Sequence, residues 1–126
     1  MDLLSYLLSK LSEEASELSQ AACKAQQNGL DSFNPKEKDT GENIITKEAN
    51  DVLGIMSMIC KVAALRDPKA KPLFAGFNDP RALDAKERKV IHYALYPYQK
   101  GILQLTEQEA IWLDSVRKEI DPSEFK

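Results

Sequence analysis

Apolar positions in the first part of the chain recur at alternating spacings of three and four residues. Between residues 3 and 27 the intervening positions hold mainly Ser, Lys, Glu and Gln, with no proline or glycine. This period places apolar side chains on one face of an α-helix. The stripe comprises Leu4, Leu8, Leu11, Ala15, Leu18, Ala22 and Ala25. Asn28-Gly29 follows, and because both residues tolerate the left-handed conformation, we expect the helix to end there.

A second apolar stripe predicts a second long helix. Residues 30–43 come before it and contain Asn, Pro and Gly within a mixed charge run, so they predict a loop. The helix is expected from about Ile44 to Leu65, and Pro68 follows its end. Its core-facing side comprises Ile45, Val52, Met56, Ile59 and Ala63, flanked by Ile55 and Val62.

A third helix is expected after an irregular segment that spans residues 68–80 and contains three prolines. Asp79 is a suitable N-cap, with Pro80 in the first turn. The helix should run to about Tyr96, because Pro97 and a later glycine follow it. The residues expected to face inward are Leu83, Val90, Ile91, Ala94 and Leu95.

Thr106 should open a fourth helix, because Glu109 stands where it completes a capping box. The apolar face of this helix comprises Ile111, Trp112, Val116 and Ile120. No stretch alternates as a β-strand would, so the sequence predicts an all-α fold, a bundle of about four helices. We expect a single domain over residues 1–126, with a core at about 3–103 and a C-terminal helix at about 106–120.

Charge and composition narrow the range of partners. The net charge of −3 argues against general nucleic-acid binding, which requires a basic surface. No apolar run approaches the roughly 20 residues that span a bilayer, and the N-terminus lacks the basic opening of a secretory signal. Cys23 and Cys60 have no CxxC spacing, so we interpret them as buried or partly buried thiols. We therefore expect a cytoplasmic protein that binds neither nucleic acid nor membrane.

Acidic residues border the apolar stripes of the first two expected helices. At 100° per residue, Glu14 and Glu17 lie at one edge of the first stripe, and Glu13 lies nearer to solvent. On the second helix Glu48 projects within about 40° of the apolar face, and Asp51 lies just outside that face. A carboxylate on an apolar face must find a partner or become neutral.

Two kinds of partner suit these acids. Lys10, Lys24 and Lys47 are near enough to pair with them, and acidic helix faces are often simply solvated. If the helices pack antiparallel, the acids converge instead, and a divalent cation would remove their mutual repulsion. Magnesium fits such a site because it prefers oxygen ligands, whereas rows without His or Cys disfavour zinc and copper.

The acidic rows also match a known signature. Residues 13–17 read EExxE and residues 48–51 read ExxD. Together they resemble the MazG-like, all-α nucleoside triphosphate pyrophosphohydrolase superfamily, and the resemblance is greatest to short, phage-type members. Further similar segments are Lys10–Glu14, Lys24–Gly29, Asn50–Leu53, and Ala85–Val90 with Tyr93 and Gly101. The resemblance covers roughly residues 3–103.

This resemblance implies an enzyme that cleaves a (deoxy)nucleoside triphosphate between the α and β phosphates, giving the monophosphate and pyrophosphate. Glu14, Glu17, Glu48 and Asp51 would be the Mg²⁺ ligands, with Mn²⁺ as an alternative ion, and Glu13 would orient water. Members commonly form homodimers or homotetramers through these helices. Phage-type members include enzymes of nucleotide-pool control that act on deoxynucleotides, in some cases dGTP, which for a phage protein means the host cytoplasm.

Other residues have less distinctive patterns. Lys86 and Lys89 are candidates for binding the β and γ phosphates, although a solvated basic face accounts for either one alone. Asn50 suits a contact to the sugar or to metal-bound water, or serves as a polar filler. His92 reads as a packed or hydrogen-bonded helix residue. The aromatic residues that could line a base pocket, with core packing as their default role, are Tyr93, Tyr96, Tyr98 and Trp112.

Two other functions are compatible with the same sequence. One is a non-catalytic helical interaction protein whose acidic rows pair with basic residues of a partner. The other is a metal-dependent hydrolase of a different phosphorylated substrate, such as a dinucleotide. Magnesium separates the interaction protein from an enzyme, because only a folded metal site gains stability from the ion.

Overall fold

The computed structural model describes residues 1–125 and confirms the all-α class, with four α-helices and one small β-hairpin. The chain divides into two compact units, residues 1–75 and residues 76 onward. Within the described residues, no helix has the length and apolar character needed to cross a membrane. Each unit is built from a pair of α-helices, and the candidate site lies in the first.

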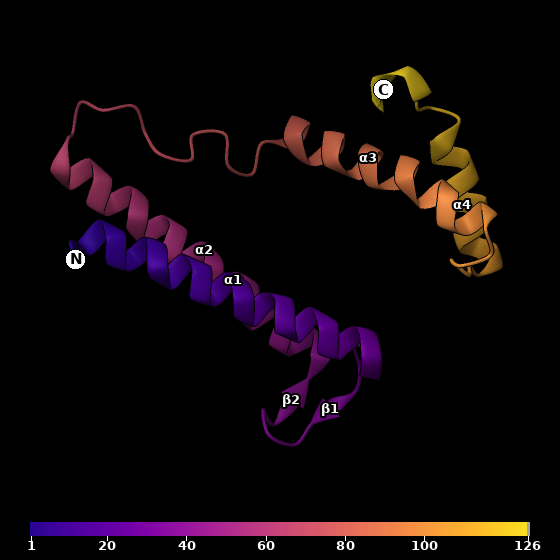
Figure 1. The fold of residues 1–126 in the computed structure, drawn as a ribbon, viewed down its shortest axis with the longest axis horizontal. Helices are drawn as coiled ribbons and strands as arrows, with labels where there is room; N and C mark the ends of the chain where they lie inside the picture. Colours follow the sequence, from indigo (N-terminus) through magenta and orange to yellow (C-terminus); the bar gives the residue numbers. More distant parts are fainter. Residues whose placement is uncertain (126) are drawn as a thin grey trace. The chain divides into compact units, whose positions relative to one another are not determined.

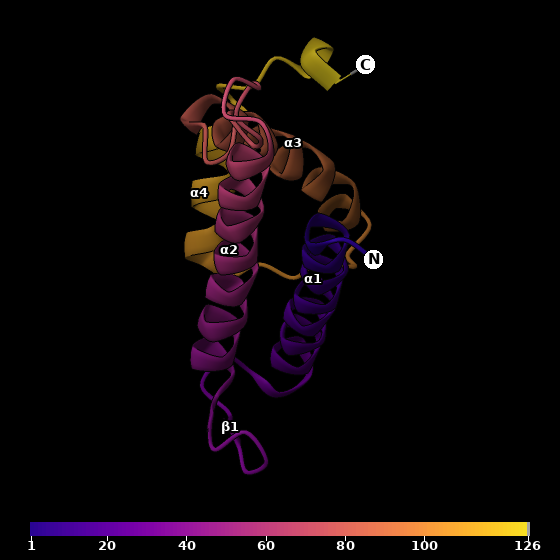
Figure 2. The ribbon, with the colours of Figure 1, turned by 90° about the vertical axis from the view of Figure 1, so that its left-hand side faces the viewer.

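The first unit is a helical hairpin. Helices α1 (Leu3–Asn28) and α2 (Gly41–Arg66) lie side by side and run in opposite directions, as Figures 1 and 2 show. Asp2 caps α1 by accepting a hydrogen bond from the Ser5 N–H, with 2.8 Å between the heavy atoms. Arg66 at the end of α2 lies 3.4 Å from the Asp2 carboxylate, an exposed ion pair at the open end of the hairpin.

The connection between the helices contains two very short strands, which corrects the expectation of an unstructured loop without strands. Strands β1 (Phe33–Asn34) and β2 (Asp39–Thr40) pair antiparallel, with Phe33 opposite Thr40. Two-residue strands are too short to produce a detectable alternation of polar and apolar residues. Helix α2 also begins three residues before the expected Ile44, because the Thr40 side chain caps its first turn.

The face that α1 buries is rotated from the predicted stripe. Leu7, Ala21 and Ala25 are buried, whereas the expected inward residues Leu8, Ala15 and Ala22 are exposed. The pattern misleads because Leu7-Leu8 and Ala21-Ala22 offer two equally apolar faces. The observed seam keeps the spacing of three and four through Leu4, Leu7, Leu11, Glu14, Leu18, Ala21 and Ala25. Glu14 therefore occupies a seam position.

The second unit contains α3 (Pro80–Gln99), α4 (Glu107–Arg117) and a 3₁₀ turn, η1 (Pro122–Phe125). The expected caps are confirmed. Asp79 caps α3, with Pro80 in its first turn. The Thr106 hydroxyl accepts a hydrogen bond from the Glu109 N–H at 3.1 Å, and the Glu109 carboxylate accepts one from the Thr106 N–H at 2.7 Å.

The ends and faces of these helices differ from expectation in several places. Helix α3 continues past Pro97 to Gln99, and α4 ends at Arg117 rather than near residue 120. Leu113 and Ile120 form the buried core of this unit. Four residues that were expected to face inward are more than half exposed, namely Leu83, Val90, Ile111 and Trp112. His92 is half-buried and stacks on Phe125 at 4.8 Å, as a packed helix residue would.

The cysteines are both free thiols. Cys60 is half-buried, and its Sγ donates a hydrogen bond to the Leu73 carbonyl over 3.3 Å. Cys23 is exposed, which corrects the expectation that it is at least partly buried. It lies next to the exposed Ala22, on the side of α1 that the rotated seam turns away from α2.

Two glycines of α2 give opposite stability predictions. A Cβ added at Gly41 would lie 3.0 Å from the Gly29 carbonyl oxygen and 3.3 Å from the Leu30 carbonyl oxygen. A Cβ added at Gly54 would have no atom within 4 Å. Gly41→Ala should therefore lower the free energy of unfolding by about 1 kcal/mol through crowding. Gly54→Ala should raise it by about 1 kcal/mol through helix propensity. Urea unfolding followed by circular dichroism measures both, and stabilisation by Gly41→Ala would contradict the close approach.

Candidate metal centre

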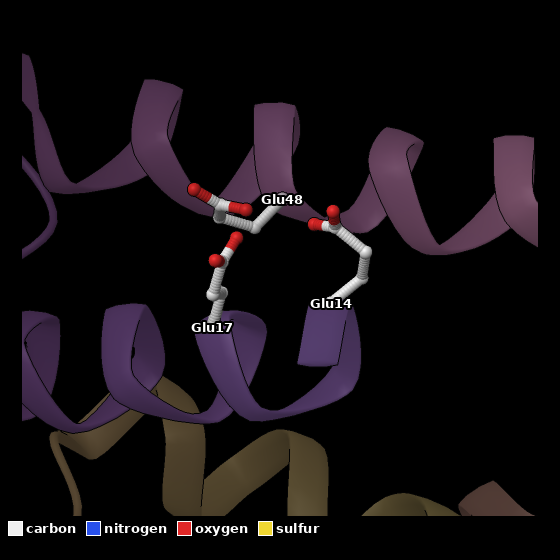
Figure 3. A group of neighbouring side chains, drawn as sticks. All are labelled: Glu14, Glu17 and Glu48. Atoms are coloured by element: carbon white, nitrogen blue, oxygen red, sulfur yellow. The ribbon is translucent and has the colours of Figure 1, made fainter. Parts of the chain in front are cut away.

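Three carboxylates from the two acidic rows meet between α1 and α2. Glu14, Glu17 and Glu48 each offer one oxygen, and these oxygens all lie within 4.8 Å of one another. Figure 3 shows the side chains of Glu14 and Glu17 rising from α1 towards the side chain of Glu48, which descends from α2. The antiparallel packing of the helices therefore brings residues from both motifs to one point.

Local sequence explains why these side chains face each other. Glu14 lies on the seam of α1, with Leu11 and Leu18 at the neighbouring seam positions. Glu17 is three residues further on, so it projects from nearly the same side one turn later. Glu48 is only 8% exposed and is the one buried charged residue among those that the structure describes. The apolar residues around them hold the helices together, and the acids fill the same interface.

Two of the carboxylate oxygens lack the partners that buried polar atoms normally have. Oε2 of Glu14 and Oε2 of Glu48 are buried and have no hydrogen-bond partner among the described residues. An unpaired buried oxygen loses its hydration without compensation, and three negative charges at this separation repel one another. A cation bound between the carboxylates would compensate for the lost hydration and for the charge repulsion. Hard ions such as Mg²⁺ prefer carboxylate oxygens as ligands.

Lysines pair with some of the acids, as the alternative interpretation expected, but only on the solvent side. Lys47 Nζ lies 3.6 Å from Oε1 of Glu48 and 3.8 Å from Oδ2 of Asp51. The negative charges of Glu48 and then of Asp51 raise the pKa of Lys47. The Lys47 side chain is 69% exposed, so solvent screens this pair. The inner oxygen of Glu48 remains unpaired.

Glu13 and Asp51 lie outside the group of three. Glu13 forms an ion pair with Lys10 at 3.0 Å, and its side chain is 52% exposed. Its hydrogen bond is the main reason that the pKa of Lys10 is raised. Asp51 stands one turn after Glu48 on α2, with its side chain 43% exposed and directed to Lys47. Of the four acids expected to bind metal, the structure thus brings together Glu14, Glu17 and Glu48.

The remaining candidate residues lie apart from this cluster or in the second unit. Asn50 is exposed on α2. Lys86 and Lys89 are exposed residues of α3. The four aromatic residues considered for a base pocket are all substantially exposed: Tyr93, Tyr96, Tyr98 and Trp112 are 54%, 65%, 41% and 57% exposed.

A cavity adjoins the acidic cluster, and the sequence did not predict it. It has a volume of about 670 Å³, and Glu17 and Glu48 form part of its wall. The rest of the wall comes from the second half of α1, the β-hairpin and the first turns of α2. The sequence feature that could have indicated it is the set of turn-forming residues within 30–43. Asn34-Pro35 and Asp39-Thr40-Gly41 favour a tight reversal of the chain there.

The acidic cluster predicts stabilisation by divalent cations. At a concentration 100 times its Kd, Mg²⁺ should add about 2.7 kcal/mol to the free energy of unfolding, because only the folded chain assembles the site. Glu48→Gln should abolish most of this gain, whereas Glu13→Gln should retain it, since Glu13 lies outside the cluster. Thermal unfolding with and without Mg²⁺ or Mn²⁺ measures the effect. If the cation stabilised the wild type and Glu48→Gln equally, Glu48 would not be one of its ligands.

The chain was also compared with known proteins. No protein-family model, no curated protein and no solved structure matches it. What the site can do therefore follows from its own residues: two acidic rows on adjoining helices, whose carboxylates meet beside an open cavity.

Proposed function

We propose that this protein is a magnesium-dependent nucleoside triphosphate pyrophosphohydrolase. The observation that carries the proposal is the meeting of Glu14, Glu17 and Glu48 between two helices, with two buried oxygens left without partners. These oxygens suit a hard divalent cation, and such a cation commonly also binds substrate phosphates. The EExxE and ExxD rows, which resemble those of MazG-like enzymes, supply the same three residues.

The acidic residues would have different roles in the proposed reaction. Glu14, Glu17 and Glu48 would hold Mg²⁺, and Asp51, one turn after Glu48 on α2, would be a fourth ligand. The ion would offset triphosphate charge and acidify an attacking water. Glu13 is solvent-exposed beside the cluster and suits the role of orienting that water or accepting its proton. Positioning of the α-phosphorus then accounts for much of the rate.

Three further residues stay candidate substrate contacts under this proposal. Lys86 and Lys89, on α3 of the second unit, are the candidates for binding the β and γ phosphates, and Asn50 is the candidate for a contact to the sugar or to metal-bound water. Each is exposed in this chain and therefore available to a ligand. Phosphate binding by flexible ammonium groups acts mainly through charge, which suits the departing pyrophosphate.

The proposed reaction predicts a defined product. Incubation with Mg²⁺ and each (deoxy)nucleoside triphosphate, dGTP included, should release pyrophosphate and the nucleoside monophosphate. Glu48→Gln should reduce kcat by at least roughly 100-fold, because one ligand of the cation is lost, while the helical circular dichroism signal is unchanged. Chromatography of the nucleotides with a coupled pyrophosphate assay measures both products. Release of orthophosphate, or no turnover with any base, would reject the proposal.

A second function, a non-catalytic helical interaction protein, is favoured by a different observation. Lysines already pair with acids at two places, Lys10 with Glu13 and Lys47 with Glu48 and Asp51. Basic residues of a partner could extend this pattern over the acidic rows. The magnesium experiment separates the two functions, because an interaction surface of this kind would not gain stability from the ion.

We also propose that the chain forms a homodimer or homotetramer. The helical hairpin buries few large side chains, and apolar residues remain on the surface of both of its helices, namely Leu3, Tyr6, Leu8, Leu53, Met58 and Leu65. Exposed apolar area on this scale is often covered by self-association. Sedimentation equilibrium should give two or four times the mass of 14.1 kDa. A monomer at micromolar concentration would contradict the proposal.

A further inference from the structure

The proposed reaction does not define the role of the cavity beside the acidic cluster, which has a volume of about 670 Å³. We propose that it binds the nucleoside part of the substrate, with Phe33 in contact with the base. This inference rests on the proposed function, because the phosphates would extend from the cavity to Glu14, Glu17 and Glu48. It assigns substrate recognition to the β-hairpin.

The cavity has the position and size required for this role. Glu17 and Glu48 belong both to the acidic cluster and to the cavity wall, so a ligand can contact both at once. Its volume of about 670 Å³ falls within the roughly 300–1,000 Å³ typical of small-molecule sites. A triphosphate held at the acids therefore has space beside it for the rest of the molecule.

Phe33 is an aromatic side chain placed where a base could stack. It lies on β1, lines the cavity, and is 60% exposed. A phenyl ring offers every base a flat apolar partner without distinguishing between bases. The ring is held by the hairpin rather than by a mobile loop, since Phe33 pairs with Thr40 across the two strands.

The turn of the hairpin is fixed by hydrogen bonds that also leave donors free. Oδ1 of Asn34 accepts hydrogen bonds from the backbone N–H groups of Lys36 and Glu37, at 2.9 Å and 3.2 Å. The amide nitrogen of Asn34 does not take part in these bonds and can donate to a ligand. Below the turn, Gly41 N–H donates to the Ser32 carbonyl at 3.1 Å, which closes the hairpin base. The cavity wall is thus largely formed before a ligand binds.

Polar side chains of α1 also line the cavity, in an order along the helix that suits a nucleotide. Glu17, Lys24 and Asn28 all line the cavity, and their spacing places them along one side of the helix. At 1.5 Å per residue, Lys24 lies about 10 Å along the axis from Glu17. The acids would hold the metal-bound phosphates, the Lys24 ammonium would meet the phosphate–sugar region, and the Asn28 amide would face the polar edge of the base.

The test measures binding of nucleoside monophosphates, which the proposed reaction does not cleave, so that it does not depend on hydrolysis. The wild-type protein should bind them in the presence of Mg²⁺, whereas ribose 5-phosphate, which lacks a base, should bind at least 5-fold more weakly. Phe33→Ala should weaken nucleotide binding by roughly 5- to 100-fold. Phe33→Trp should restore it, because the indole keeps the stacking surface. Leu30→Ala is the matched control, since Leu30 is also exposed but does not line the cavity. Isothermal titration calorimetry gives each Kd.

Kinetics then separate this inference from the proposed function. If triphosphates are hydrolysed, Phe33→Ala should raise KM by a similar factor, and Leu30→Ala should not change it. Hydrolysis with an unchanged KM in Phe33→Ala would overturn the nucleoside site while leaving the proposed reaction in place. Monophosphate binding that depends on Phe33, without hydrolysis of any triphosphate, would support the cavity and reject the reaction. Equal binding of monophosphates and ribose 5-phosphate would overturn recognition of the base.

Discussion

The packing of α1 against α2 is constrained by acidic residues at positions that the helix geometry assigns to the interface. Glu14 and Glu48 lie in the two seams, where the neighbouring residues are apolar. Bringing them together with Glu17 opposes folding in the absence of a cation, because the charges repel and two oxygens lose their hydration. Buried contacts such as those of Ile59 and Leu7, which are 1% and 2% exposed, must offset this cost.

The hairpin connection determines the geometry of both the cluster and the cavity. Gly41 allows the start of α2 to approach the end of α1, with its would-be Cβ position only 3.0 Å from the Gly29 carbonyl oxygen. This contact brings the helices close at one end, and the exposed ion pair between Arg66 and Asp2 lies at the other. The close approach at Gly41 therefore constrains how α2 starts against the end of α1.

The elements of this fold could be predicted from the sequence more readily than their orientation. Cap residues such as Asp79 and Thr106 act through local hydrogen bonds, and both predicted caps are present. Which face of α1 is buried depends on α2, and adjacent leucines such as Leu7 and Leu8 leave the local pattern ambiguous. The exposed Trp112 shows the same limit, because an apolar side chain does not reveal whether the chain itself or another molecule covers it.

For the candidate site, too, the sequence predicts which acids share one helix face, but not which acids of the two helices meet. Spacing along one helix predicts that Glu14 and Glu17 share a side, and the structure adds Glu48 from the other helix. Asp51 lies outside this group and pairs with Lys47, whose Nζ lies 3.6 Å from Glu48 and 3.8 Å from Asp51. Such an exposed pair contributes little to stability, so a divalent cation can compete with Lys47 for Glu48 and Asp51. The lysine would then partly neutralise the acids of the free protein without blocking access to the inner oxygens.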